Sequence, residues 1–173
     1  MNARTIVTHS PEETIAFGAE LARELQPPVL VLLLGDLGAG KTTLTKGIVA
    51  GLGAAPEEEV TSPTFTMIHE YGIAAVDRPV AHAPGSDADS AARGIPDSDK
   101  AGGTRVYHVD LYRVETAREL ETLGLEDLLA ERAVVIVEWG ERLGPALRPL
   151  NPGGVVEIHL EAAGESERRI EVR

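Results

Sequence analysis

Two hydrophobic patterns recur along the chain, one typical of buried strands and one typical of amphipathic helices. Residues 29–34 (VLVLLL) and 133–139 (AVVIVEW) are almost uninterrupted apolar runs, which suit strands buried on both faces of a parallel sheet. Residues 106–112 (VYHVDLY) are predicted to form a further strand. Residues 155–160 and 168–172 alternate apolar and polar positions, which predicts antiparallel strands at the margin of the sheet.

Helices are predicted among these strands. Residues 10–25 open on a capping box and then repeat an apolar residue at every fourth position, as an amphipathic helix does. Residues 41–52 repeat that spacing, and residues 116–130 are predicted to be helical with a break at Gly124. Residues 61–71 hold a Ser-Pro turn and an alternating stretch of strand type. This order of elements predicts an α/β protein with a parallel core and antiparallel marginal strands.

The length of 173 residues fits one domain, interrupted by one segment of different composition. Residues 74–104 are rich in Ala, Gly, Pro and Ser and hold few sizeable aliphatic side chains. Such a segment buries too little apolar surface to offset the entropy lost on ordering it. We therefore expect a single domain over residues 1–173 with a disordered insertion at 74–104, unless a partner orders that loop on binding.

Composition argues against several classes of protein. The net charge is −12, the basic residues are scattered, and aromatic residues are scarce, so direct binding of nucleic acid is not expected. The chain has no cysteine, which removes disulfides and thiolate chemistry. Its longest aliphatic run is six residues, whereas a membrane span needs about 20. We expect a soluble, cytoplasmic protein without a membrane contact.

A phosphate-binding loop is the strongest chemical signal in the sequence. Residues 35–42 (GDLGAGKT) match the pattern G-x-x-x-x-G-K-[ST] between a predicted buried strand and a predicted helix. Lys41 can reach the β- and γ-phosphates, and the Thr42 hydroxyl can bind Mg²⁺. The pattern alone does not distinguish a kinase, an ATPase or a GTPase. The predicted nucleotide-binding residues of the loop are Gly35, Asp36, Leu37, Gly38, Ala39, Gly40, Lys41 and Thr42.

Two carboxylates are candidates for the metal and the attacking water. Glu138 ends one buried strand, and Asp110 lies near the end of another. Ligands in open α/β sheets bind outside the carboxyl ends of the strands, so one acid could hold Mg²⁺ while the other orients water. The alternative is that either acid caps a turn or pairs with an arginine. Trp139 follows Glu138 directly, and from the sequence alone it is interpreted as a core residue.

The segment Thr61-Ser62-Pro63-Thr64 lies between the phosphate-loop helix and the next predicted strand. In many phosphate-loop proteins this region senses the γ-phosphate and moves on hydrolysis. Thr61, Ser62 and Thr64 are therefore candidate switch residues. An ordinary Ser-Pro turn explains the same residues equally well.

The chain resembles the bacterial TsaE family, also called YjeE, in five segments that occur in the family's order. They are far more specific together than the phosphate loop, because general kinases do not share SPTF, HVDLYR and VEW. The segments are residues 35–47 (GDLGAGKTTLTKG), 61–71 (TSPTFTMIHEY), 107–113 (YHVDLYR), 119–129 (ELETLGLEDLL) and 137–143 (VEWGERL).

The resemblance implies a Mg²⁺-dependent P-loop ATPase that is required for threonylcarbamoyladenosine formation in tRNA. In the family this protein does not transfer the carbamoyl group. It associates with TsaB and TsaD, which hold the tRNA, and its ATP hydrolysis supports their repeated turnover. The residues that match family positions are Lys41, Thr42 and Thr43 at the phosphates, Asp110 and Glu138 as the acids, Trp139 beside the site, Thr61 to Thr64 as a switch, and a segment around Thr8–Thr14 near the base.

Two features depart from the family pattern, and two other functions stay open. Residues 74–104 form a longer connection than expected, and Gly140 stands where Pro is frequent. A small-molecule kinase would need a lid with several arginines, whereas the insertion holds only Arg78 and Arg93. A nucleotide-gated binding module would bind partners differently with ATP and ADP, and hydrolysis would be incidental to its role.

Overall fold

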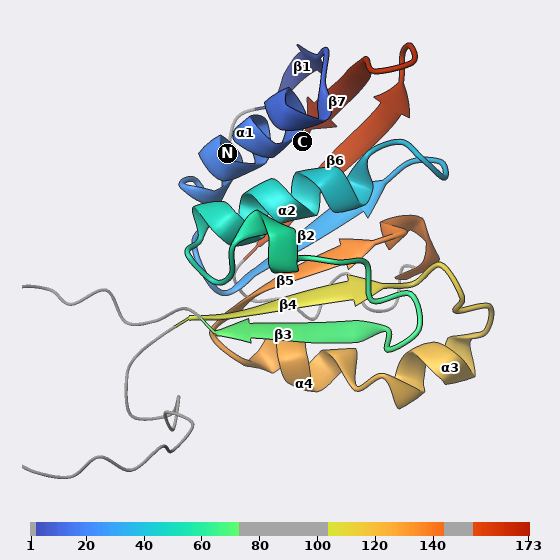
Figure 1. The fold of residues 1–173 in the computed structure, drawn as a ribbon. Coiled ribbons are helices and arrows are strands. Elements are labelled where there is room, and N and C mark those ends of the chain that lie inside the picture. Colours follow the sequence, from blue (N-terminus) through green and yellow to red (C-terminus); the bar gives the residue numbers. More distant parts are fainter. Residues whose placement is uncertain (1–2, 73–103, 144–153) are drawn as a thin grey trace, which may run out of the picture.

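The described part of the chain forms a mixed sheet of seven strands with helices on both faces (Figure 1). The computed structural model describes residues 3–72, 104–143 and 154–173. The elements in chain order are β1 (Arg4–Thr8), α1 (Pro11–Ala22), β2 (Val29–Leu34), α2 (Lys41–Gly51), η1 (Glu57–Glu59), β3 (Ile68–Gly72), β4 (Arg105–Asp110), α3 (Ala117–Thr122), α4 (Leu125–Ala130), β5 (Ala133–Glu138), η2 (Gly140–Leu143), β6 (Val155–Ala162) and β7 (Arg168–Val172).

The strand order is β1-β7-β6-β2-β5-β4-β3. Strands β6, β2, β5 and β4 run parallel to one another, whereas β1, β7 and β3 join by antiparallel pairing. The predicted parallel core with antiparallel margins is therefore confirmed. One detail differs, because β6 is antiparallel only to β7 and pairs in parallel with β2 on its other edge. The outermost strand on that side is β1, which the hydrophobic pattern did not predict.

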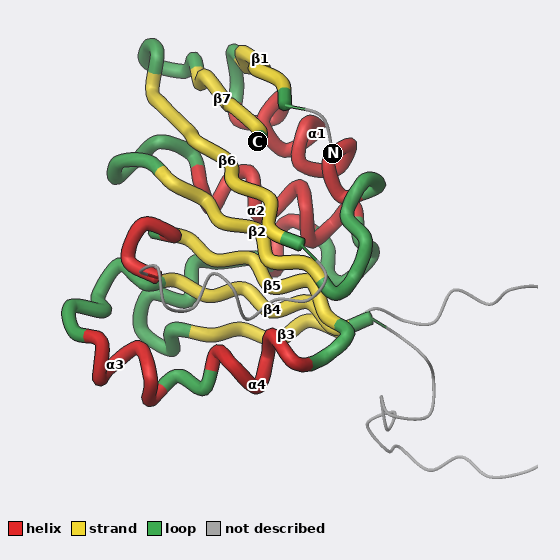
Figure 2. Tube along the Cα trace, turned by 180° about the vertical axis from the view of Figure 1, so that it is seen from behind, coloured by secondary structure: helices red, strands yellow, loops and turns green. Residues whose placement is uncertain are grey.

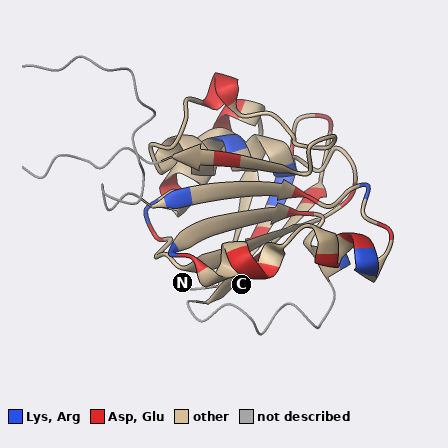
Figure 3. Cartoon of the chain, turned by 90° about the horizontal axis from the view of Figure 1, so that it is seen from below, with Lys and Arg blue, Asp and Glu red and all other residues tan. Residues whose placement is uncertain are grey.

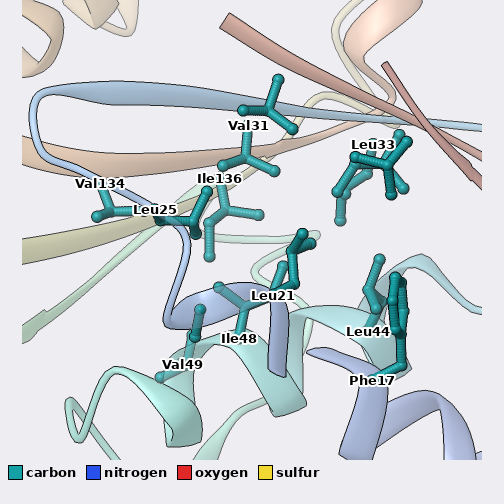
Figure 4. Packing of buried hydrophobic residues seen from close by; sticks show 14 of the residues in the cluster. Phe17, Leu21, Leu25, Val31, Leu33, Leu44, Ile48, Val49, Val134 and Ile136 are labelled. Atoms are coloured by element: carbon teal, nitrogen blue, oxygen red, sulfur yellow. The ribbon is translucent and has the colours of Figure 1, made fainter. Parts of the chain in front are cut away.

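The hydrophobic core lies in two layers, one on each face of the sheet. Helices α1 and α2 cover one face, and α3 and α4 lie on the other face at the end of the sheet that holds β3, β4 and β5 (Figures 1 and 2). Figure 4 shows the first layer, in which apolar side chains of both helices point toward the sheet. That layer includes Phe17, Leu21, Leu44 and Ile48 from the helices and Val31, Leu33, Val134 and Ile136 from the strands.

Helices α1 and α2 cross at glycines. A Cβ atom added to Gly47 would lie 2.0 Å from the carbonyl oxygen of Ile15, and one added to Gly18 would lie 2.6 Å from that of Leu44. Real Cβ atoms do not approach backbone this closely, so both positions require glycine for the helices to pack. This crossing fixes α2, and with it the loop that precedes α2, against the sheet.

Several boundaries differ from the predictions, and one segment lies outside the described residues. Helix α1 ends at Ala22 rather than at Leu25, and the predicted strand at 106–112 runs from Arg105 to Asp110. The predicted break at Gly124 is confirmed, since this glycine has a φ of 62° between α3 and α4. Apart from Thr104, the predicted insertion at 74–104 lies outside the described residues.

The basic residues are scattered in the structure, as the sequence indicates. Lys and Arg positions lie apart from one another among Asp and Glu positions in the view of Figure 3, which shows no continuous basic strip. Within residues 3–72, 104–143 and 154–173, no helix is long and apolar enough to cross a membrane.

Candidate functional site

The phosphate loop connects β2 to α2 and turns on glycines. Gly35 has a φ of 141°, and a Cβ atom there would lie 2.2 Å from the carbonyl oxygen of Leu160 on β6, so the turn requires glycine at this position. Helix α2 then begins at Lys41 behind Gly40, and its N-terminus has no side-chain cap. The first N–H groups of a helix lack partners within the helix, and together with the helix dipole they favour an anion at this end.

Lys41 is folded back onto this loop. Its side chain is buried, and Nζ donates hydrogen bonds to the carbonyl oxygens of Gly35 at 2.6 Å and Asp36 at 2.9 Å. Burial lowers the pKa of the Lys41 ammonium from its ordinary value of 10.5, although carboxylates led by Glu138 act in the opposite direction. The lysine is therefore a partly desolvated cation at the mouth of an anion-binding loop.

Glu138 meets the loop from the end of β5. Its side chain is only 3% exposed, and Oε2 accepts a hydrogen bond from the Thr42 hydroxyl at 3.0 Å. Oε1 accepts from His108 Nε2 at 2.8 Å. The Thr45 hydroxyl lies 3.4 Å from Oε1 and donates over a shorter distance, 3.0 Å, to the carbonyl oxygen of Lys41. The predicted closeness of Glu138 and the phosphate loop is thus present in the structure.

Asp110 lies beside Glu138 at the end of β4, because the two residues are paired in the parallel register of β4 and β5. Its Oδ2 accepts hydrogen bonds from the Ser62 hydroxyl at 2.5 Å and the Thr64 hydroxyl at 2.8 Å. Its Oδ1 accepts from the backbone N–H of Tyr112 at 2.9 Å. Asp110 therefore ties the candidate switch segment to the carboxyl end of the sheet.

Trp139 lies at the cavity beside Lys41, whereas Thr61 lies away from the cavity. Trp139 is half-buried with a φ of 61°, and its ring centroid lies 3.8 Å from Lys41 Nζ. The indole packs against the core layer on the face of α3 and α4, as the sequence interpretation has it, and it also lines the cavity. Thr61 is exposed and is not among the residues that line the cavity, unlike Ser62 and Thr64.

A cavity of about 620 Å³ joins these groups. One wall comes from the phosphate loop and the ends of β4 and β5. The other comes from the start of α1, with Pro11 and Thr14, from the turn between β6 and β7, with Glu165 and Ser166, and from Arg168 at the start of β7. Among the predicted loop residues, the cavity is lined by Leu37, Gly38, Gly40, Lys41, Thr42 and Thr43, whereas Gly35, Asp36 and Ala39 shape the loop without lining it.

Sequence reasoning missed several contributors to the site, including Tyr112 and Glu165, which line the cavity. His108 and Thr45 contact Glu138, and Ser166 and Arg168 line the cavity. A period of two along β4 places His108 on the same face as Asp110, and that spacing could have identified it. The turn between β6 and β7 gave no local signal, because it reaches the loop only through the folded sheet.

The side chains at the site suit a cation that is bound jointly by protein oxygens, phosphate and water, rather than by protein side chains alone. Within the described ranges no group of three or more His, Cys, Asp and Glu side chains could hold a metal ion. Thr42, Glu138 and Asp110 offer one hydroxyl and two carboxylates. A cation that takes few protein ligands and completes its shell with phosphate and water, as Mg²⁺ does, fits such a set.

A glycine-rich loop between a buried parallel strand and the helix that covers it defines this chain as an α/β protein of the P-loop class. The family model "Threonylcarbamoyl adenosine biosynthesis protein TsaE" matches residues 8–84 and 97–170. The chain therefore belongs to the TsaE family, whose members take part in the biosynthesis of threonylcarbamoyladenosine in tRNA.

Relatives and a solved structure agree with this assignment. The TsaE protein of Bacillus subtilis is 35% identical over 94% of this chain and 80% of its own length. The TsaE protein of Treponema pallidum is 30% identical, with 96% and 97% covered. The crystal structure of YdiB from Bacillus subtilis matches with a TM-score of 0.59 at 30% identity, over 99% of this chain and 84% of that one.

Proposed function

We propose that the protein is a Mg²⁺-dependent ATPase that supports threonylcarbamoyladenosine modification of tRNA through a complex of TsaB- and TsaD-like proteins. The observation that supports it is the double contact of the strand ends: Glu138 reaches Thr42 of the phosphate loop, and Asp110 beside it reaches the switch segment. The site of action would be the cytoplasm, and tRNA would be contacted only by the partners. The net charge of −12 supports that division of roles.

The phosphates would lie on the loop, against the uncapped start of α2. Lys41 would leave the carbonyl oxygens of Gly35 and Asp36 and turn toward the β- and γ-phosphates. The partly buried ammonium gains strength as a phosphate ligand, because water screens it less than it would screen a surface lysine. The base would lie on the wall formed by Pro11, Thr14 and the turn between β6 and β7.

Thr42, Glu138 and Asp110 are the residues that would hold Mg²⁺. When bound, the ion would neutralise charge that develops on the phosphate oxygens during hydrolysis. Glu138 is already oriented toward Thr42, so little reorganisation is needed on that side. Asp110 accepts hydrogen bonds from two hydroxyl groups of the switch segment, and this carboxylate would orient the attacking water once those hydroxyls move.

Phosphate release without any added acceptor tests hydrolysis against phosphoryl transfer to a small molecule. The parental protein should release phosphate slowly from Mg·ATP. Lys41→Ala should abolish the release in a protein that still unfolds cooperatively, at a melting temperature lowered by the loss of two loop hydrogen bonds and the contact with the Trp139 ring. The matched control is Lys46→Ala, because Lys46 lies on the same helix and does not line the cavity. Release that appears only with an acceptor would favour a kinase.

Partner turnover tests whether hydrolysis is needed or incidental. The purified chain would be mixed with TsaB- and TsaD-like proteins of its own organism, tRNA and substrates, and modified nucleoside would be counted over several turnovers. Glu138→Gln keeps the size of the side chain and removes its charge, so it should permit nucleotide binding and stop repeated turnover. If Glu138→Gln sustains the parental number of turnovers, the protein is a nucleotide-gated binding module instead.

A further inference from the structure

His108 lies behind Glu138, on the side away from the phosphate loop. It belongs to β4, its side chain is fully buried, and Nε2 lies 2.8 Å from Glu138 Oε1. Glu138 itself is 3% exposed. An uninterrupted contact thus runs from His108 through the Glu138 carboxylate to the Thr42 hydroxyl at 3.0 Å.

The sheet register explains how a residue of β4 reaches this position. His108 is paired with Ile136 on β5, and Asp110 is paired with Glu138. Ile136 belongs to the core layer under α1 and α2, and side chains of paired residues point to the same face. His108 therefore points toward α2, which brings Thr45 to the same carboxylate from the helix side.

The hydrogen bonds of Glu138 are divided between its two oxygens. Oε1 accepts from His108 of the buried strand β4 at 2.8 Å. The Thr45 hydroxyl lies 3.4 Å from Oε1, but its single proton has a shorter hydrogen bond to the carbonyl oxygen of Lys41 at 3.0 Å, so His108 is the main donor to Oε1. Oε2 accepts only from Thr42 among the described residues, and Thr42 lies in the first turn of α2, where it lines the cavity. One oxygen is thus fixed by the scaffold while the other faces the site.

The burial of His108 is unfavourable for a residue that only fills the core. Its Nδ1 has no hydrogen-bond partner among the described residues, and an unpaired buried polar atom is destabilising. A leucine or a valine would fill a buried strand position without that penalty. The imidazole is therefore better explained by the bond that its Nε2–H donates to Glu138 than by packing.

We infer that His108 is a positioning residue for Glu138: its Nε2–H holds Oε1 so that Oε2 stays directed at Thr42 and the metal side of the cavity. This inference rests on the proposed ATPase function. His108 does not line the cavity, and the hydrogen bond of its side chain is to Glu138, so it would act through that carboxylate. Partners that orient metal-ligating side chains in this way typically contribute about 10–100-fold to metal affinity or activity.

Two substitutions of similar polarity separate positioning from packing. His108→Gln places an amide N–H near the position of Nε2, whereas His108→Asn is too short to reach Oε1. We expect His108→Asn to lower kcat about 10–100-fold with KM within about threefold, and His108→Gln to stay within about threefold of the parental kcat. The second readout is the ratio of ADP affinities with Mg²⁺ and with EDTA, which should fall about tenfold in His108→Asn only.

The outcomes distinguish this inference from the proposed function. If the parental protein neither hydrolyses ATP nor binds ADP more tightly with Mg²⁺, the proposed function fails. If the parental protein does both and a folded His108→Asn protein matches it in both, the positioning role is wrong. A structural role alone would lower the melting temperature of both variants without separating their affinity ratios.

A measurement on the unaltered protein covers the case in which the variants do not fold. Nitrogen-15 NMR of the imidazole distinguishes its two tautomers. His108 should carry its proton on Nε2 in the nucleotide-free protein, since that nitrogen faces a carboxylate oxygen. A His108 ring without a proton on Nε2 cannot donate to Glu138, and that result would overturn the inference.

Discussion

The ammonium of Lys41 rests on the face of the Trp139 ring, with Nζ 3.8 Å from the ring centroid. The Tyr112 ring also lies against Trp139, with the two ring centroids 5.2 Å apart. A desolvated contact between a cation and an indole contributes about 2 kcal/mol. A bound triphosphate would draw Lys41 away from this ring and from two loop carbonyl oxygens. Nucleotide binding should therefore change the environment of the indole directly.

Trp139 fluorescence should therefore report occupancy of the site. It is the only tryptophan of the chain, so no other indole masks the signal. Emission should change when Mg²⁺ is added with ATP or ADP, because the lysine leaves the ring and the local field changes. The change should shrink in Lys41→Ala and with EDTA. An unmoved spectrum at full occupancy, established by equilibrium dialysis, would separate this indole from the nucleotide.

The lowered pKa of Lys41 predicts that nucleotide affinity falls on the alkaline side before pH 10.5 is reached. Without nucleotide, burial favours the neutral amine, so the lysine loses its proton at a lower pH than an exposed lysine does. Bound phosphate favours the ammonium and raises its pKa again. Binding in that alkaline window must therefore take up a proton, and ADP affinity should fall up to about tenfold per pH unit.

Calorimetry in buffers of different ionisation enthalpy would detect that proton uptake. The matched control is Lys41→Ala, which has no amine at this position and should show a flatter affinity profile up to pH 10.5. Equal alkaline slopes in the two proteins would assign the proton to another group.

The switch segment offers a test of Asp110. Asp110→Asn should lower hydrolysis about 10–100-fold while ADP affinity stays within about threefold, because the carboxylate is proposed to act on water and metal more than on the diphosphate. Ser62→Ala removes one hydrogen bond to Oδ2 of Asp110 and should lower hydrolysis by a smaller factor. Thr66→Ala is the control, since Thr66 is an exposed residue of the same loop. Single-turnover phosphate release measures all three.

The close crossing of α1 and α2 predicts that alanine in place of Gly47 destabilises the fold. Gly47→Ala would place a methyl group 2.0 Å from the carbonyl oxygen of Ile15, and forced overpacking of this kind destabilises by about 1–3 kcal/mol. Gly72→Ala is the control, because nothing lies within 4 Å of a Cβ atom there and no left-handed φ is recorded. Urea unfolding would compare them, and equal midpoints would show that the helices can separate without loss.

The sequence predicts the site best where local pattern and chemistry coincide. The phosphate loop follows from one contiguous motif, and Glu138 and Asp110 follow from the rule that strand ends meet at one edge of the sheet. Strand β1 was missed because its partner β7 lies at the opposite end of the chain. The contact of Thr45 with Glu138 joins residues 93 positions apart, and no local spacing encodes such a pair.

The end of the β3–β4 pair that lies away from Asp110 is a position where the chain can accept an insertion. Gly72 and Arg105 face each other in the antiparallel register, at the end of β4 opposite to the one that carries Asp110 (Figure 1). Chain added or removed between these two residues starts and finishes at neighbouring points on the sheet, at the opposite end of β4 from Asp110. We therefore expect that a fluorescent reporter or an affinity tag inserted at this junction would leave the candidate site intact.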